Sequence, residues 1–384
     1  LRRNTARVLI QIMKDLVRAH GDTCRQLKLA HDFRRAASGK PRIVRALLAQ
    51  YHLLEMPEEW NQLAFDNHVH DANTKGRKNP THLIMDAWIK GIRHLTVIYY
   101  NFVESAAARE LMQAADIMGV SVRIGVEFRV PARHKYAELI WVPRGFSDSQ
   151  GFLSFLEETP TQHLMQEGRK ASQYLAEYVL QVLRRYNERH RRAINDEFGL
   201  TLEPLHPDEF LAFVGTGQPS LLHLAEFIHK RLVPALQGRV EELRDEWTIA
   251  TQPERDAIEA LVQRLDALDA ETVHDLWLAP GCNPDLPSAF VPREGTDVPD
   301  ILRTPPRALL DWLTSLHSGY RITLNLSELT VADVLELLWD CEGLITHLEL
   351  FNLKDWAEGD EAHVANIRAI NELQLAINSG SAPR

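Results

Sequence analysis

The chain has 384 residues, of which 45% are hydrophobic and 25% are charged, and its formal net charge at pH 7 is −10. This composition is typical of a globular protein with a sizeable core, either one large barrel with additions or two ordinary domains. No apolar run reaches the roughly 18 residues of a membrane helix and no signal segment opens the chain, so we expect neither a membrane span nor secretion. Because the first residue is Leu1 rather than Met, we expect the sequence to begin inside a longer product.

The three cysteines, Cys24, Cys282 and Cys341, are widely separated and form no C-x-x-C pattern. An odd number of isolated cysteines favours a reducing compartment, so we expect a cytoplasmic protein with buried or idle thiols. The chain also lacks zinc-ribbon spacing, a G-x-S-x-G nucleophile elbow, a Walker loop and an H-E-x-x-H motif.

Positive charge is concentrated at the start of the chain. Residues 1–50 hold twelve Lys or Arg and three Asp, a net charge of +9, which leaves −19 for the remainder. Helical periodicity predicts helices over residues 5–19, 23–37 and 42–54, so residues 1–60 form a basic N-terminal helical extension. One interpretation is contact with nucleic acid, an acidic partner or the rest of a larger protein. The alternative is that these helices pack on the acidic body of their own chain.

Residues 64–69 form a short apolar run that ends in a His-x-His pattern. Residues two apart on a strand point to the same face, so His68 and His70 share one side. Two imidazoles on one face are compatible with a metal site.

Helices and strands alternate after this run. A helix is predicted over residues 80–91, with Pro80 at its start and Gly91 past its end. A strand over 95–100, a helix over 104–118 and a strand over 120–128 complete a β-α-β-α-β order. Such alternation implies parallel strands covered by helices, with the site built from side chains at the strand ends.

The segment from residue 66 to residue 127 resembles the amino-terminal half of the PHP (polymerase and histidinol phosphatase) family. The family pattern is roughly D-x-H-x-H-T-x-x-S-D-G-x-x-x-P, a helix, I-T-D-H and G-x-E. The matching residues are Asp66, His68, His70, Gly76, Pro80, Gly91, Ile92, Gly125 and Glu127. The resemblance implies a distorted (β/α)7-type barrel over residues 61–384, with a helical and loop insertion over 240–304.

Two of the metal ligands that the resemblance implies are replaced in this half. Lys75 stands where the family has the Asp of S-D-G, and Tyr99 and Tyr100 stand where it has the Asp and His of I-T-D-H. An ammonium group at Lys75 would repel a second metal ion and could instead neutralise a bound anion.

The resemblance is patchier in the carboxyl-terminal half. His223 matches the His of an R-P-H-[IL]-A segment, and Glu138 is the nearest equivalent of another ligand His. Residues 343–352, with Gly343, Leu344, Leu348, Glu349 and Asn352, resemble the carboxyl-terminal part of the family. Asn325 replaces a further His, and Ala382 and Arg384 replace the Asp and His of a terminal G-S-D-x-H.

The metal ligands of the family that this chain keeps are His68, His70, Glu127 and His223. By the resemblance they imply at most one divalent ion, which would be zinc, manganese or iron. Two His and a carboxylate suffice for one catalytic ion with an open position. The candidate catalytic residues are Glu127, Lys75 and Tyr100.

Two functions remain open from the sequence. The first is a reduced, one-metal phosphoester hydrolase of PHP descent, acting on a phosphorylated small molecule or an oligonucleotide. The second is a catalytically inactive PHP-like binding or scaffolding module of a larger protein, with the basic arm as a contact surface.

Overall fold

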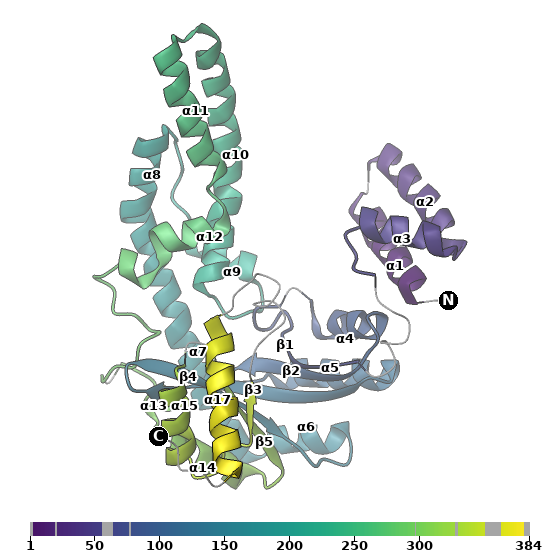
Figure 1. Cartoon of the computed structure of the whole chain (residues 1–384), viewed down its shortest axis with the longest axis vertical. Coiled ribbons are helices and arrows are strands. Elements are labelled where there is room, and N and C mark those ends of the chain that lie inside the picture. Colours follow the sequence, from purple (N-terminus) through teal and green to yellow (C-terminus); the bar gives the residue numbers. More distant parts are fainter. Residues whose placement is uncertain are drawn as a thin grey trace. The chain divides into compact units, whose positions relative to one another are not determined.

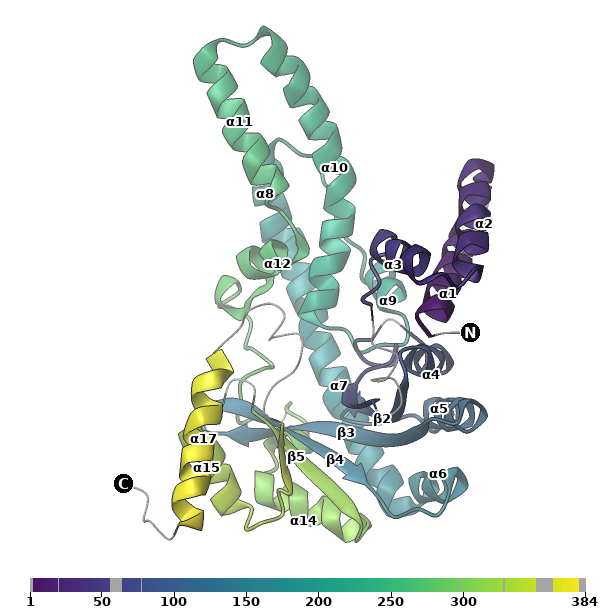
Figure 2. The same ribbon diagram turned by 45° about the vertical axis from the view of Figure 1, so that its right-hand side comes forward.

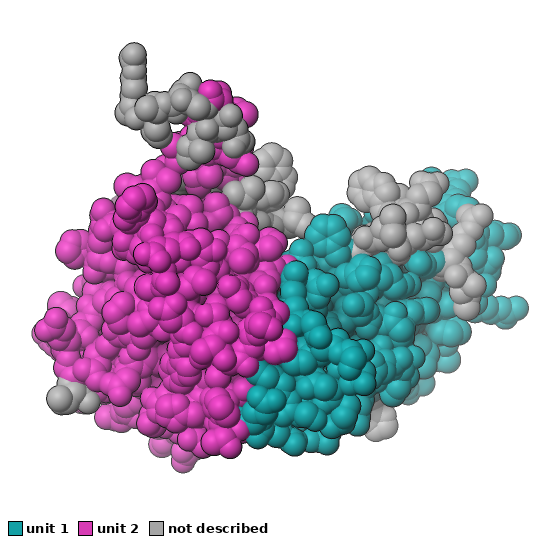
Figure 3. All heavy atoms as spheres, turned by 90° about the horizontal axis from the view of Figure 1, so that it is seen from below, with its two compact units in different colours: residues 1–99, 103–125, 142–158 teal, residues 100–102, 126–141, 159–384 magenta. Residues whose placement is uncertain are grey.

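The computed structural model describes residues 3–19, 21–55, 64–76, 78–295, 297–326, 329–349 and 362–379 (Figure 1). The chain divides into two compact units, coloured in Figure 3. Unit 1 is Leu1–Tyr99, Val103–Gly125 and Val142–Glu158; unit 2 is Tyr100–Phe102, Val126–Trp141 and Thr159–Arg384. The expected division at residue 60 stays a prediction.

The fold is mixed α/β, and its six described strands form one sheet in the order β1-β2-β3-β4-β5-β6. The strands are β1 (Ala64–Val69), β2 (Ile92–Tyr100), β3 (Ser121–Ala132), β4 (Lys135–Pro143), β5 (Tyr320–Asn325) and β6 (His347–Glu349). The expected parallel pairing holds for β1 with β2 and for β5 with β6. Strands β3 and β4, for which the sequence predicted no pairing, pair antiparallel because only two residues, Arg133 and His134, connect them.

The β-α-β-α-β order predicted over residues 64–128 is confirmed. Unit 1 holds this order except for the ends of β2 and β3, which belong to unit 2. Its helices are α1 (Arg3–Arg18), α2 (Thr23–Ala37), α3 (Pro41–Gln50), α4 (Pro80–Ile89), α5 (Ser105–Met118) and α6 (Ser149–Glu157). The Asn79 side chain accepts a hydrogen bond from the His82 amide at the start of α4, and Gly119, at φ 63°, ends α5. The start of α4 and the end of α5 are therefore set by the local sequence.

Unit 2 begins its main helical part with a long helical stretch over residues 159–198, which a π turn interrupts. The three parts are α7 (Thr159–Arg185), the π turn Tyr186–His190 and α8 (Arg191–Phe198). Helix α9 (Pro207–Val214) leads to α10 (Leu221–Ile249), which lies beside α11 (Gln252–Asp266) (Figures 1 and 2). Helix α10 runs without a break through residue 240, where the sequence predicted an insertion to begin.

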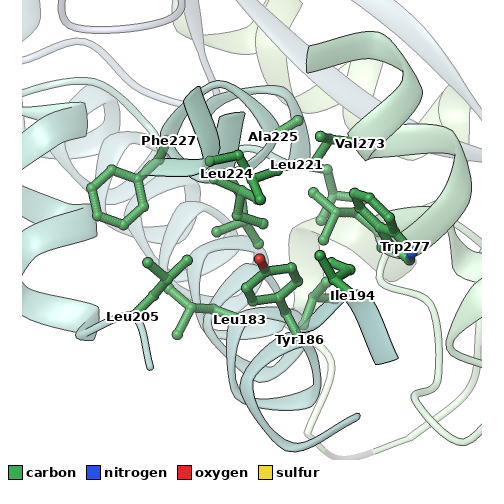
Figure 4. Packing of buried hydrophobic residues seen from close by; sticks show 14 of the residues in the cluster. Leu183, Tyr186, Ile194, Leu205, Leu221, Leu224, Ala225, Phe227, Val273 and Trp277 are labelled. Carbon is green, nitrogen blue, oxygen red and sulfur yellow. The ribbon is translucent and has the colours of Figure 1, made fainter. Parts of the chain in front are cut away.

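The core of unit 2 lies among these helices. Its buried hydrophobic residues include Tyr186, Leu224, Phe227 and Trp277 (Figure 4). The remaining elements are α12 (Ala270–Val273), a π turn His274–Leu278, a 3-10 turn Pro280–Cys282, α13 (Asp300–Arg303), α14 (Pro306–Leu316), α15 (Val331–Asp340) and α17 (Ala362–Asn378). Residues 350–352 of the predicted carboxyl-terminal motif, and Ala382 and Arg384, lie outside the described residues. Among the described helices, none combines the length and the apolar character needed to cross a membrane.

Candidate functional site

The two histidines of the His-x-His pattern meet at the carboxyl end of β1. Their Nε2 atoms lie 3.1 Å apart, and their rings are inclined by 61° with centroids 4.9 Å apart. This geometry confirms the prediction that His68 and His70 share one side. Asp66 lies beside them, because one of its carboxylate oxygens accepts a hydrogen bond from the His68 amide at 3.2 Å.

The tautomer of His70 follows from its second ring nitrogen. Nδ1 lies 3.0 Å from the carbonyl oxygen of Ile98 on β2. Because a carbonyl oxygen only accepts hydrogen bonds, Nδ1 carries the hydrogen and Nε2 carries the lone pair. Burial, followed by the positive charge of Lys75 and the neighbouring His68, lowers the pKa of His70 to about 3. His70 is therefore neutral at physiological pH, with its lone pair directed at the His68 ring.

This arrangement fits a two-nitrogen metal ligand set. Two nitrogens bound at about 2.0–2.1 Å to a tetrahedral ion lie roughly 3.3 Å apart, close to the Nε2 separation of this pair. A metal-binding His also commonly donates its other N–H to a backbone carbonyl, as His70 does to Ile98. A hydrogen bond from His68 Nε2–H to His70 Nε2 has the same separation. The geometry is therefore compatible with a metal and does not require one.

A buried carboxylate that the sequence analysis missed shapes the loop after His70. Asp71 has 0% exposed surface and accepts hydrogen bonds from the Asn73 amide at 2.8 Å, the Asn73 side chain at 3.0 Å and the Tyr99 hydroxyl at 2.6 Å. Its backbone carbonyl accepts from Thr74 Oγ1 and from the Gly76 amide. The Asp-x-Asn spacing, typical of a side chain that closes its own turn, was the available signal.

Gly76 allows this loop to close. A Cβ atom at this position would overlap the backbone carbonyl of His70. The glycine predicted from the motif is thus required by a close backbone approach. The loop that carries Lys75 is consequently fixed at both ends by Asp71 and by the Ala72 amide, which donates to the Lys78 carbonyl.

Unit 2 brings together a second set of predicted site residues. Glu127 is 5% exposed, and burial and the nearby carboxylates of Glu127 and Glu138 raise the pKa of Tyr100. The Tyr100 phenol therefore keeps its proton and remains a hydrogen-bond donor.

Glu138 is held by protein groups. Arg129 faces it across the β3–β4 ladder, with Arg129 Nη2 3.6 Å from Glu138 Oε1. Asn325 Nδ2 donates to Glu138 Oε2 at 2.9 Å. Glu138 and Asn325 are thus bonded to each other, and the guanidinium of Arg129 supplies the positive charge.

His223 lies in the first turn of α10. Its amide donates to the hydroxyl of the N-cap residue Ser220, and its Nδ1 lies 3.2 Å from the same oxygen. Burial lowers the pKa of His223. These contacts are those of a residue at a helix start, and its predicted role as a metal ligand stays a prediction.

No group of three or more His, Cys, Asp or Glu side chains placed to hold a metal ion is found within the described ranges. His68 and His70 belong to unit 1, whereas Glu127 and His223 belong to unit 2. The four-residue ligand set expected from the sequence stays a prediction, as does the division of catalytic roles among Glu127, Lys75 and Tyr100.

Comparisons with known proteins give similarity at the level of solved structures alone, since no family model and no curated protein matches the sequence. A proposed metal-dependent phosphoesterase from Bifidobacterium adolescentis is 12% identical, with 75% of this chain and 77% of that chain covered and a TM-score of 0.44. An amidohydrolase from Chromobacterium violaceum, with bound sulfate and no metal, is 15% identical, with 77% and 80% covered and a TM-score of 0.46. At these values neither neighbour assigns a family or an activity to this chain.

Proposed function

We propose that this chain is a PHP-like domain of the metal-dependent phosphoester hydrolase lineage, built on a distorted (β/α)7-type barrel, whose site is reduced to one divalent ion. His68 and His70 would hold the ion, and Glu127 is the third ligand that the sequence predicts. The observation that carries the proposal is the 3.1 Å approach of the two Nε2 atoms, with His70 held in the Nδ1–H tautomer by the Ile98 carbonyl. The ion would be zinc, manganese or iron, since imidazole and carboxylate suit these metals.

When bound, such an ion supplies a metal-bound water of lowered pKa as the nucleophile for hydrolysis. The residues of the chain would prepare the site for this chemistry. His70 stays neutral because its pKa lies far below physiological pH, so no proton competes for its lone pair. The ammonium group of Lys75 would attract the phosphate, and the protonated Tyr100 phenol would donate a hydrogen bond to a phosphate oxygen.

A second candidate, a catalytically inactive binding or scaffolding module, is favoured by the surroundings of Glu138. Arg129 and Asn325 already supply the positive charge and the hydrogen bond that a metal and its ligands would otherwise supply at this position. Under this alternative the domain would bind a phosphorylated molecule or another part of a larger protein without hydrolysing a phosphoester.

Metal content distinguishes the two candidates. The protein would be purified without chelator, dialysed against zinc or manganese, and analysed by inductively coupled plasma mass spectrometry beside the double variant His68→Ala/His70→Ala. We expect about one ion per chain in the wild type and loss of that ion in the double variant. The control His94→Ala/His134→Ala removes two exposed histidines and should keep the ion.

Absence of metal above background in the wild type would reject the hydrolase and leave the binding module. If the ion is bound, hydrolysis of bis-p-nitrophenyl phosphate is then measured for the wild type and for Glu127→Gln. We expect Glu127→Gln to lower metal occupancy and turnover together, because an amide is a weaker ligand than a carboxylate.

A further inference from the structure

The first three helices form a small bundle with its own core. Val8, Ile12, Leu29, Leu47 and Leu48 are buried in it, each with 6% or less of its surface exposed. Helices α1 and α2 lie side by side along this core (Figures 1 and 2). The bundle therefore presents its charged residues on a packed scaffold.

All three acidic side chains of the bundle accept hydrogen bonds from other residues of the bundle. Asp15 bonds to Gln11 and Arg18, and Asp22 caps α2 through the Arg25 amide. Asp32, which is 3% exposed, accepts hydrogen bonds from Gln50, Tyr51 and Arg35. Little negative charge is thus left on the outer surface of α2 and α3.

The cations of α2 and α3, by contrast, project to the outside. Five exposed basic residues make no ion pair with any residue that the structure describes: Arg25, Lys28, Arg34, Lys40 and Arg42. They lie on α2, on the turn that follows it and at the start of α3. The segment that carries them is positively charged, whereas the remaining residues of the protein are strongly acidic.

The bundle meets the body of unit 1 through different cations. The charge of Asp86 on α4 acts on Arg7 and Lys14, both of which belong to α1. The sequence left open that the basic arm packs on an acidic body. This packing accounts for the positive charges of α1 and leaves those of α2 and α3 unexplained.

Helices α2 and α3 are joined by the three-residue turn Ser38, Gly39 and Lys40, with Gly39 at φ 65°. A short turn of this kind, with Gly, joins the two helices of DNA-binding helix-turn-helix units as well as those of αα-hairpins. In the DNA-binding units the second helix presents its first residues to the major groove while the first helix crosses the backbone. Lys40 and Arg42 lie at the start of that second helix. We infer that the α2–turn–α3 surface binds double-stranded DNA through its phosphates.

The test measures the affinity of the full chain for a fluorescein-labelled 24-base-pair duplex by fluorescence anisotropy at 50 to 200 mM KCl. Five phosphate contacts predict a slope of log Kobs against log salt of about −4.5. The triple variant Lys28→Gln/Arg34→Gln/Arg42→Gln should bind at least about tenfold more weakly at 50 mM, with a slope less steep by about 3. These changes lie on exposed side chains, and an unaltered circular dichroism spectrum would show that the bundle still folds.

A matched control removes three positive charges from another part of the chain. Arg189, Arg192 and Arg244, also exposed and also in no ion pair with described residues, are replaced by Gln. This control should bind the duplex within about twofold of the wild type. Failure of the wild type to bind at 50 mM KCl, equal loss of affinity in both triple variants, or tighter binding of a single strand or of polyglutamate than of the duplex would overturn the inference.

Discussion

At the scale of single residues, the hydroxyl of Tyr99 and the carboxylate of Asp71 form the contact that ties β2 to the loop after β1. Tyr99 is 2% exposed and Asp71 is 0% exposed, and their oxygens lie 2.6 Å apart. This hydrogen bond supports the loop that leads to Lys75.

Replacing Tyr99 by Phe should destabilise the protein by about 1–3 kcal/mol, because a buried carboxylate then loses a hydrogen-bond donor. Burial and the charge of Asp71 also raise the pKa of Tyr99, so above about pH 10 the unfolded chain releases this proton while the folded chain keeps it. Stability should therefore fall as pH rises above about 10, and this contribution should be absent from Tyr99→Phe.

Urea-induced unfolding at pH 7.5 and pH 10.5, followed by circular dichroism, measures both effects. The control is Tyr320→Phe, because the Tyr320 hydroxyl makes no hydrogen bond with a described residue. Equal stability of Tyr99→Phe and Tyr320→Phe at pH 7.5 would contradict the role assigned to the Asp71–Tyr99 bond.

At the scale of elements, α7 approaches the end of β2 through a glycine. A Cβ atom on Gly168 would overlap the backbone carbonyl of Asn101, which itself adopts φ 61°. One turn further along α7, Ser172 accepts a hydrogen bond from the Asn101 side chain at 3.3 Å. Glycine is therefore needed at position 168 for the close contact with Asn101, although it is less favourable than alanine inside a helix.

Gly168→Ala should destabilise unit 2 by about 2 kcal/mol or more, since the helix must move away from a backbone that cannot yield. Gly238→Ala on α10 is the matched control, because a Cβ there meets nothing within 4 Å. It should stabilise the protein by about 0.5–1 kcal/mol, the gain of Ala over Gly in a helix. Thermal unfolding of the two variants checks the opposite signs, and a shift of the same sign in both would contradict the close approach at Asn101.

At the scale of the whole molecule, the sign of the charge changes along the chain. Residues 1–54 carry +9 and residues 55–384 carry −19, which together give −10. The proposed metal ligands His68, His70 and Glu127 belong to β1, the residue after it and β3, whereas the proposed DNA-binding surface lies on α2 and α3. The two proposals therefore use different parts of the chain.

Deleting residues 1–54 should abolish duplex binding and leave the metal content per chain unchanged. The deleted protein has a net charge of −19 and should elute later from an anion-exchange column than the full chain. Anisotropy and metal analysis of the same sample measure both quantities. Loss of the metal together with the bundle, in a protein that keeps its circular dichroism spectrum, would contradict the independence of the two sites.

The order of elements and one pair of site residues were determined by the sequence itself. Apolar periodicity, Pro80 and Gly91 predicted α4 and its neighbouring strands, because caps and period are local properties of the chain. The approach of His68 to His70 was likewise predictable, since alternation along a strand places residues two apart on one face. The fixed tautomer of His70 was not, because it depends on the Ile98 carbonyl of another strand.

Only the tertiary structure decided the remaining features. Nothing local distinguishes Glu138 as the partner of Arg129 and Asn325, because Asn325 lies 187 residues further along the chain. The buried position of Asp71 depends on Tyr99, 28 residues away, and the need for Gly168 depends on the Asn101 backbone. The antiparallel β3–β4 pair and the uninterrupted α10 were also missed, since strand pairing and helix length are set by packing partners that sequence periodicity does not specify.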